Sequence, residues 1–124
     1  KVALKHIDQA EEKIEKDRVI DIIKNQPKQY QVVLFSILQL KKTTQILFTG
    51  ELYEHYQQTC KQTGLRPLTQ RRIADIIAEF DLLGVVNAKV ISKGRYGRTR
   101  EISLSNTLQT HDQIQKILEE ELNI

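Results

Sequence analysis

Hydrophobic residues recur at helical spacing through most of this chain, and the clearest case lies between residues 70 and 83. There the apolar positions form one continuous stripe on a helical wheel. The stripe consists of Ile73, Ile76, Ile77, Phe80 and Leu83. Thr69 stands where an N-cap residue belongs, and Gly84 where a left-handed glycine commonly ends a helix. The pattern predicts an amphipathic helix from Gln70 to Leu83.

Two further helices are predicted before this one. From Lys28 to Lys42, apolar residues occupy most faces of the wheel, which indicates a central, largely buried helix that follows Pro27. Thr49 is placed to cap a helix from Gly50 to Thr63, which Gly64 ends. The residues that share one face of this helix are Leu52, Tyr53, Tyr56 and Cys60.

Helical patterns also occupy both ends of the chain. Residues 1–25 show helix-like spacing broken near Asp17, and residues 110–122 predict a last helix. The chain begins at Lys1 without a methionine, in what reads as the middle of a helix, so we expect a fragment of something longer. We expect residues 1–25 to be a helical connector and residues 26–124 to form the main domain.

A β-hairpin is predicted after Gly84. The apolar runs Val85–Ile91 and Glu101–Leu104, with their valines and isoleucines, read as short strands, and Lys93–Arg100 between them contains two glycines. Residues 43–48 read as a linker or a small strand, and residues 65–68 as a turn between two helices. The order of helix, helix, turn, helix and hairpin predicts a mainly α fold with a small β-hairpin, a winged helix-turn-helix.

Composition narrows the class of protein. The 124 residues suffice for one domain with a real core, and an apolar content of 40% excludes an intrinsically disordered chain. No apolar run approaches the roughly 20 residues that cross a bilayer, and no signal peptide is evident. The single cysteine, Cys60, cannot form an internal disulfide, which favours a reducing, cytoplasmic setting.

The net charge of +3 is small, but the positive charge is local. Residues 85–100 contain five cations and no acid, namely Lys89, Lys93, Arg95, Arg98 and Arg100. Glycines among the cations would let the backbone approach a phosphate closely, because they lack the Cβ that would collide. This hairpin therefore indicates a polyanionic partner, and the alternative is a charged run that is merely solvated.

Two groups of residues are candidates for contact with DNA. Arg71 and Arg72 lie in the first turn of their helix, where arginine can donate two hydrogen bonds to a guanine, or both can be ordinary surface residues. Asp75 and Glu79 would be repelled by phosphates, so only the start of this helix should approach the duplex. In the hairpin, at least two of Arg95, Arg98 and Arg100 should project together into a minor groove. Tyr96 packs on sugars or braces the turn, and Lys93 and Lys89 contact phosphates or nothing.

The sequence shows no pattern typical of metal binding or of catalysis. The histidines are scattered, without the spacing of a metal site, and they are His6, His55 and His111. Cys60 reads as a buried structural thiol, and Tyr53 and Tyr56 as core residues. No phosphate-binding loop and no set of nucleophile, base and orienting group is present, so we expect this chain not to be an enzyme.

Four blocks of sequence together resemble one family. They are Thr49–Tyr56, Pro67–Ile73, Leu83–Val86 and Ser92–Thr99, they occur in the family's order, and the resemblance covers about residues 27 to 108. The family is the C-terminal winged-helix domain of archaeal replication initiators, which are similar to both the first origin recognition subunit and cell division control protein 6. The resemblance implies binding to duplex repeats at replication origins, with one helix in the major groove and the wing in the minor groove. It also implies a nucleoid-associated protein that recruits the replicative helicase.

The resemblance carries over to particular positions. It assigns Thr69, Arg71 and Arg72 to the start of the recognition helix, and Gly94, Arg95, Tyr96, Gly97 and Arg98 to the wing. It implies an AAA+ ATPase part in the longer protein, whose lid would end in residues 1–25, and it confines ATP or ADP and Mg²⁺ to that part.

Two other functions are compatible with the same fold. One is a protein-interaction domain that docks the helicase or a second initiator through the acidic last helix and the segment Ile46–Phe48. The other is a transcription regulator, from which composition alone does not separate an initiator.

Overall fold

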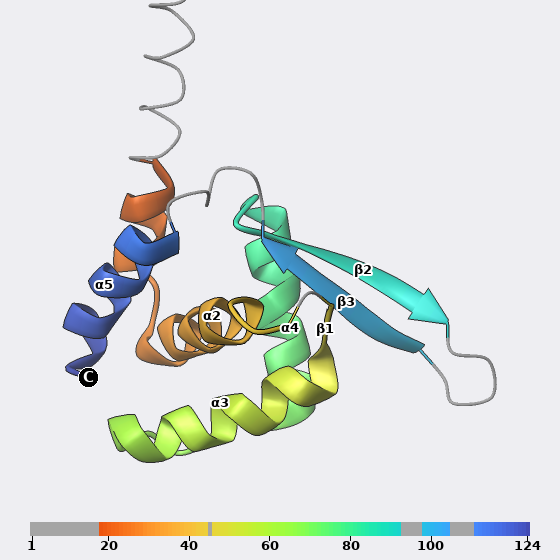
Figure 1. Cartoon of the computed structure of the whole chain (residues 1–124), viewed down its shortest axis with the longest axis horizontal. Coiled ribbons are helices and arrows are strands. Elements are labelled where there is room, and N and C mark those ends of the chain that lie inside the picture. Colours follow the sequence, from red (N-terminus) through yellow and green to blue (C-terminus); the bar gives the residue numbers. More distant parts are fainter. Residues whose placement is uncertain (1–17, 45, 93–97, 105–110) are drawn as a thin grey trace, which may run out of the picture.

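The computed structural model describes residues 18–44, 46–92, 98–104 and 111–124. The helices predicted from residue 28 onward and both hairpin strands are present in the described residues, and so is a short strand within residues 43–48 (Figure 1). The helical pattern predicted for residues 1–17 lies outside the described residues. The elements are α2 (Lys28–Lys41), β1 (Leu47–Phe48), α3 (Thr49–Thr63), α4 (Gln70–Leu82), β2 (Val86–Ser92), β3 (Arg98–Leu104) and α5 (His111–Leu122). The prediction of a mainly helical winged helix is confirmed.

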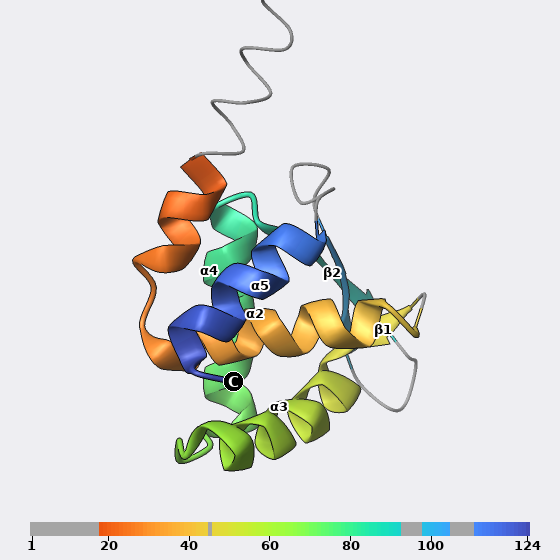
Figure 2. The same ribbon diagram turned by 60° about the vertical axis from the view of Figure 1, so that its left-hand side comes forward.

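Helix α2 is the centre of the core. Its residues from Tyr30 to Leu38 are all buried, as the apolar residues on most of its faces predict. It packs against α3, α4 and α5, and Figures 1 and 2 show these helices on different sides of it. Two polar side chains are buried with the apolar ones, and Ser36 satisfies its hydroxyl by donating to the Val32 carbonyl at 2.9 Å.

Helix α3 begins one residue earlier than predicted. Phe48 is its N-cap residue, and Thr49 is already helical, so the prediction of Thr49 as the cap is wrong. The Thr49 hydroxyl instead donates to the Arg100 carbonyl of β3 at 3.4 Å, because the pairing of β1 with β3 brings these two segments of the chain together. Gly64 ends the helix with φ at +73°, as predicted. Cys60 is fully buried, and burial raises the pKa of its thiol, as expected for a structural cysteine.

Helix α4 has the predicted cap and the predicted stripe. Thr69 is the N-cap residue, and its Oγ1 accepts the Arg72 N–H at 3.2 Å. Ile73, Ile76, Ile77 and Phe80 are completely buried. The helix ends at Leu82, one residue before the predicted end, and Gly84 follows with φ at +78°.

The sheet has three antiparallel strands in the order β1-β3-β2, rather than the two of a simple hairpin. Leu47 pairs with Ile102, and Val86, Ala88 and Val90 pair with Leu104, Ile102 and Arg100. In the segment Ile46–Phe48, which the protein-docking hypothesis uses, Leu47 is buried by the sheet, whereas 53% of the Ile46 surface is exposed.

The ends of the described chain complete the core. Residues 18–24 are helical, and Val19 and Ile23 are buried. Helix α5 lies across α2 (Figure 2) and buries Ile114, Leu118 and Leu122. The Lys28 ammonium donates to the Glu121 backbone carbonyl and so ties the start of α2 to the end of α5. None of the helices in the described ranges has the length and apolar character that crossing a membrane requires.

Candidate nucleic-acid interface

The start of α4 is exposed and carries positive charge. Gln70, Arg71 and Arg72 are exposed, and the first turn holds no acidic residue. The Thr69 cap satisfies one of the four N–H groups that a helix start leaves without a helical partner. The others add to the partial positive charge of the helix end, so this end favours an anion.

The two adjacent arginines have different surroundings. The Arg72 guanidinium donates to the Tyr30 hydroxyl of α2 at 3.4 Å and lies 6.0 Å from the centre of that ring. Burial first, and then the nearby Glu79 carboxylate, raise the pKa of Tyr30. Arg72 and Glu79 therefore both belong to the side of α4 that faces α2. Arg71 lies on the side that faces the sheet.

A groove of about 550 Å³ separates the start of α4 from the sheet. Its helical wall consists of Gln70, Arg71 and Ala74. Its strand wall consists of Val90, Thr99 and Arg100, and Thr49 of α3 adds to the lining. The groove thus joins two guanidinium groups with hydroxyl and amide side chains, a combination that can bind an oxyanion such as a phosphate.

Arg100 connects the two walls of this groove. Its Nη1 donates to the Ala74 carbonyl of α4 at 2.8 Å. The prediction places Arg100 in the tip of the hairpin, but the residue lies within β3 and pairs with Val90. One of its five N–H donors is used on Ala74, so the others can contact a phosphate while the bond holds the strand against the helix.

The structure describes only part of the predicted wing tip. Strands β2 and β3 extend to Ser92 and Arg98, so Arg98 belongs to a strand and not to the tip as predicted. Lys93, Gly94, Arg95, Tyr96 and Gly97 lie outside the described residues. Their expected contacts remain predictions.

Several residues of this site are not predicted from the sequence. Gln70, Val90 and Thr99 line the groove next to predicted residues, and strand alternation could have indicated Val90 because it pairs with Arg100. Tyr56 is buried in the core and Tyr53 packs against it, as predicted, and their hydroxyls also bind the turn before α4, which the sequence does not indicate. No group of acidic, histidine or cysteine side chains suited to a metal occurs in the described part of the chain.

Replacing Arg100 with alanine should lower the free energy of unfolding by about 1.5–3 kcal/mol, because the bond from a charged donor to Ala74 is lost. Urea denaturation measures this change. Lys89→Ala is the control, since Lys89 is exposed on β2 and should change stability by no more than about 0.5 kcal/mol. Equal losses in the two variants would show that the bond to Ala74 contributes nothing.

A helix-turn-helix of α3 and α4, followed by an antiparallel hairpin beside the second helix, defines a winged-helix domain. The chain belongs to the family described as CDC6, C terminal winged helix domain, whose sequence model matches residues 21–114. This confirms the resemblance found in the sequence.

Relatives among known proteins agree with this membership. The chain is 50% identical over 108 residues to the ORC1-type DNA replication protein of Pyrococcus horikoshii, which covers 86% of this chain and 26% of the relative. It is 50% identical over 101 residues to ORC1-type DNA replication protein 4 of Haloarcula marismortui, covering 81% of this chain and 19% of that protein. The chain therefore spans about a quarter or less of the length of these relatives.

Two solved structures share the fold. The Orc1 protein of Aeropyrum pernix, determined in complex with DNA, superimposes with a TM-score of 0.81 at 38% identity over 94% of this chain and 30% of that protein. Cdc6p of Pyrobaculum aerophilum superimposes with a TM-score of 0.62 at 20% identity over 83% of this chain and 26% of that protein, which shows the fold alone.

Proposed function

We propose that this chain binds duplex DNA at replication origins, with the start of α4 in the major groove and the wing in the adjacent minor groove. The observation that carries the proposal is the groove between α4 and the sheet, where Arg71 and Arg100 face one opening. A DNA strand that separates a major from a minor groove would run between the two elements that enter those grooves. The related Orc1 protein was determined in complex with DNA, which supports DNA as the partner.

The arrangement gives the candidate residues separate roles. Arg71 is exposed at the positive end of α4 and can reach a base edge or a phosphate. Arg100 is held by Ala74 and contacts the phosphate strand between helix and wing. Arg72 supports the helix through Tyr30, and contacts DNA with the donors that this bond leaves. Asp75 is exposed further along α4, so the helix approaches DNA by its first turn.

Titration of the chain on a duplex from the origin region of its own genome tests the proposal. If α4 and the wing neutralise about 3 to 5 phosphates, the logarithm of the association constant should fall with the logarithm of the salt concentration at a slope of roughly −3 to −4.5. Footprints at two salt concentrations should show protected repeats within the origin. Binding without salt dependence, or uniform protection of unrelated DNA, would refute origin binding by this groove.

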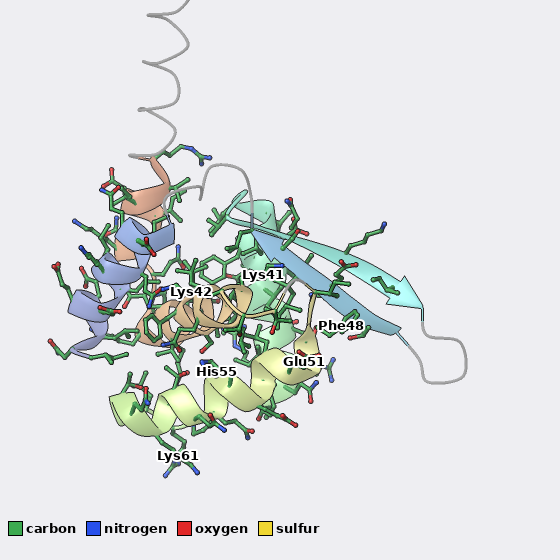
Figure 3. The ribbon with its side chains drawn as sticks, viewed as in Figure 1. Lys41, Lys42, Phe48, Glu51, His55 and Lys61 are labelled. Atoms are coloured by element: carbon green, nitrogen blue, oxygen red, sulfur yellow. The ribbon has the colours of Figure 1, made fainter. Side chains whose placement is uncertain are left out.

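The wing carries cations that are predicted from the sequence to contact DNA. The double replacement Arg95→Ala and Arg98→Ala should weaken binding and flatten the salt slope by about 2, because each lost phosphate contact removes about 0.9. Lys61→Ala combined with Lys116→Ala is the control with the same change in net charge. Lys61 lies at the end of α3 away from the sheet (Figure 3), and Lys116 is exposed on α5. An unchanged salt slope in the wing variant would show that the wing does not contact the DNA phosphates.

A further part of the proposed function concerns the longer protein to which this domain would belong. We infer that this domain acts within a longer initiator that carries an AAA+ ATPase part, where ATP or ADP and Mg²⁺ bind, and that a helicase or a second initiator is a further partner. The size of the ORC1-type relatives supports this inference. ATP binding by the longer gene product, compared with none by the 124-residue chain, is the measurement that tests it.

A further inference from the structure

The turn that precedes α4 is bound by side chains of two other helices. Residues 65–69 have no regular backbone structure, so the polar groups of this segment need partners from elsewhere. The backbone bond from the Leu65 N–H to the Cys60 carbonyl marks where α3 ends, and the bond from the Ile73 N–H to the Thr69 carbonyl marks where α4 begins. Between these two bonds, the peptide groups of the turn reach tyrosine and glutamine side chains.

Leu68 is held at both of its backbone polar groups. Its N–H donates to the Tyr56 hydroxyl at 2.9 Å, and its carbonyl accepts from the Tyr53 hydroxyl at 2.8 Å. Tyr53 and Tyr56 stand one turn apart on α3, and their rings stack with centres 6.0 Å apart. Two side chains of one helix therefore determine where this residue lies.

Gln29 extends the same contacts to α2. Its Oε1 accepts from the Tyr56 hydroxyl at 2.5 Å, and its Nε2 donates to the Arg66 carbonyl at 2.8 Å. The Tyr56 hydroxyl is thus both acceptor and donor, and burial raises the pKa of this phenol. We call Gln29, Tyr53 and Tyr56 the turn clamp.

We propose that the turn clamp positions the start of α4 for reading DNA, and that Tyr53 and Tyr56 are positioning residues for recognition. Leu68 directly precedes Thr69, the cap of α4, and Arg71 follows two residues later. A bidentate contact to a base edge requires its side chain within about 0.5 Å of the productive position, which supporting hydrogen bonds secure. The inference rests on the proposed function, because it assigns the clamp a role in that binding.

The test uses Tyr56→Phe and Tyr53→Phe in the 124-residue chain, with an origin duplex and an unrelated duplex of equal length as probes. Each variant keeps its ring and loses one hydroxyl, so the Leu68 peptide loses one partner. We expect binding to the origin duplex to weaken about threefold to tenfold, while binding to the unrelated duplex and the salt slope stay nearly unchanged. A change of stability alone cannot produce this loss of discrimination in a chain that remains folded.

Ser36→Ala is the matched control. It also removes a buried hydroxyl between α2 and α3, where Ser36 lies 3.4 Å from the Thr59 hydroxyl, but it leaves the turn untouched. It should keep the full discrimination between the two duplexes. If it lost discrimination as the tyrosine variants do, the effect would be one of general packing and the clamp would have no special role.

Amide hydrogen exchange separates failure of the clamp from failure of the proposed function. Faster exchange confined to residues 65–72 in Tyr56→Phe would support positioning whether or not the wild-type chain prefers the origin duplex. Exchange that is unchanged there would overturn the clamp while leaving DNA binding intact. Where the wild type prefers the origin duplex, an unchanged preference in both tyrosine variants would likewise overturn its role in recognition. Absence of salt-dependent binding by the wild type would instead refute the proposed function.

Discussion

Replacing Arg71 with alanine should weaken binding to the preferred duplex by about 1–3 kcal/mol, or about 5- to 150-fold, if this guanidinium donates to a base. Arg71 is exposed at the positive end of α4 and lines the groove that faces the sheet. Its neighbour Arg72 is engaged with Tyr30, so Arg72→Ala should have the smaller effect on affinity. Fluorescence anisotropy on a set of duplexes, each changed at one base pair, measures both variants.

The pattern of loss identifies what Arg71 contacts. Relaxed preference at one base position would mean a base contact, whereas an equal loss on every duplex, with the salt slope flattened by about 1, would mean a phosphate contact. Lys116→Ala is the control, because it removes one positive charge on α5, on the side of the molecule away from the sheet (Figure 1). A loss in the control as large as that of Arg71→Ala would mean that only the net charge matters.

Replacing Phe80 with alanine should lower the free energy of unfolding by about 3–5 kcal/mol, because it opens a cavity in the core. Phe80 is completely buried on the apolar stripe of α4, and its ring meets that of Tyr30 edge-on, with centres 5.9 Å apart and planes 68° apart. The loss is large compared with the 5–15 kcal/mol by which domains are generally stable. Urea denaturation at neutral pH measures it.

Leu82→Ala is the matched control for Phe80→Ala. Leu82 is on the same helix, but 88% of its surface is exposed, so its replacement should change stability by no more than about 0.5 kcal/mol. Similar losses in both variants would mean that the stripe of α4 does not face the core in solution.

The helices could be predicted because their signals are local. The stripe of Ile73, Ile76, Ile77 and Phe80 has a period that only a helix places on one face, and all four residues are buried. Thr69, Gly64 and Gly84 act where their backbone and side-chain preferences place them. The prediction of Thr49 as a cap is wrong because Phe48 belongs to β1 and pairs with Glu101 of β3. The helix therefore begins directly after Phe48, at Thr49.

The candidate site was only partly predictable. The charges of Arg71, Arg72 and Arg100 are evident in the sequence, and the family membership follows from the order of four local blocks. The residues that these arginines contact are not evident in the sequence. Arg100 meets Ala74 from 26 residues away, and Arg72 meets Tyr30 from 42 residues away. These contacts depend on how α2, α4 and β3 pack, and the spacing of hydrophobic residues along the chain does not predict that packing.

By itself, the sequence determined the class of fold, the buried face of each helix and the region of concentrated positive charge, since these depend on residue type and on spacing along the chain. Only the tertiary structure decided that β1 completes the sheet, that Arg71 faces the groove while Arg72 turns to Tyr30, and that two core tyrosines bind the turn before α4. The physical reason is that a hydrogen bond depends on the positions of two groups in space. Those positions are established only when helices and strands far apart in the sequence pack together.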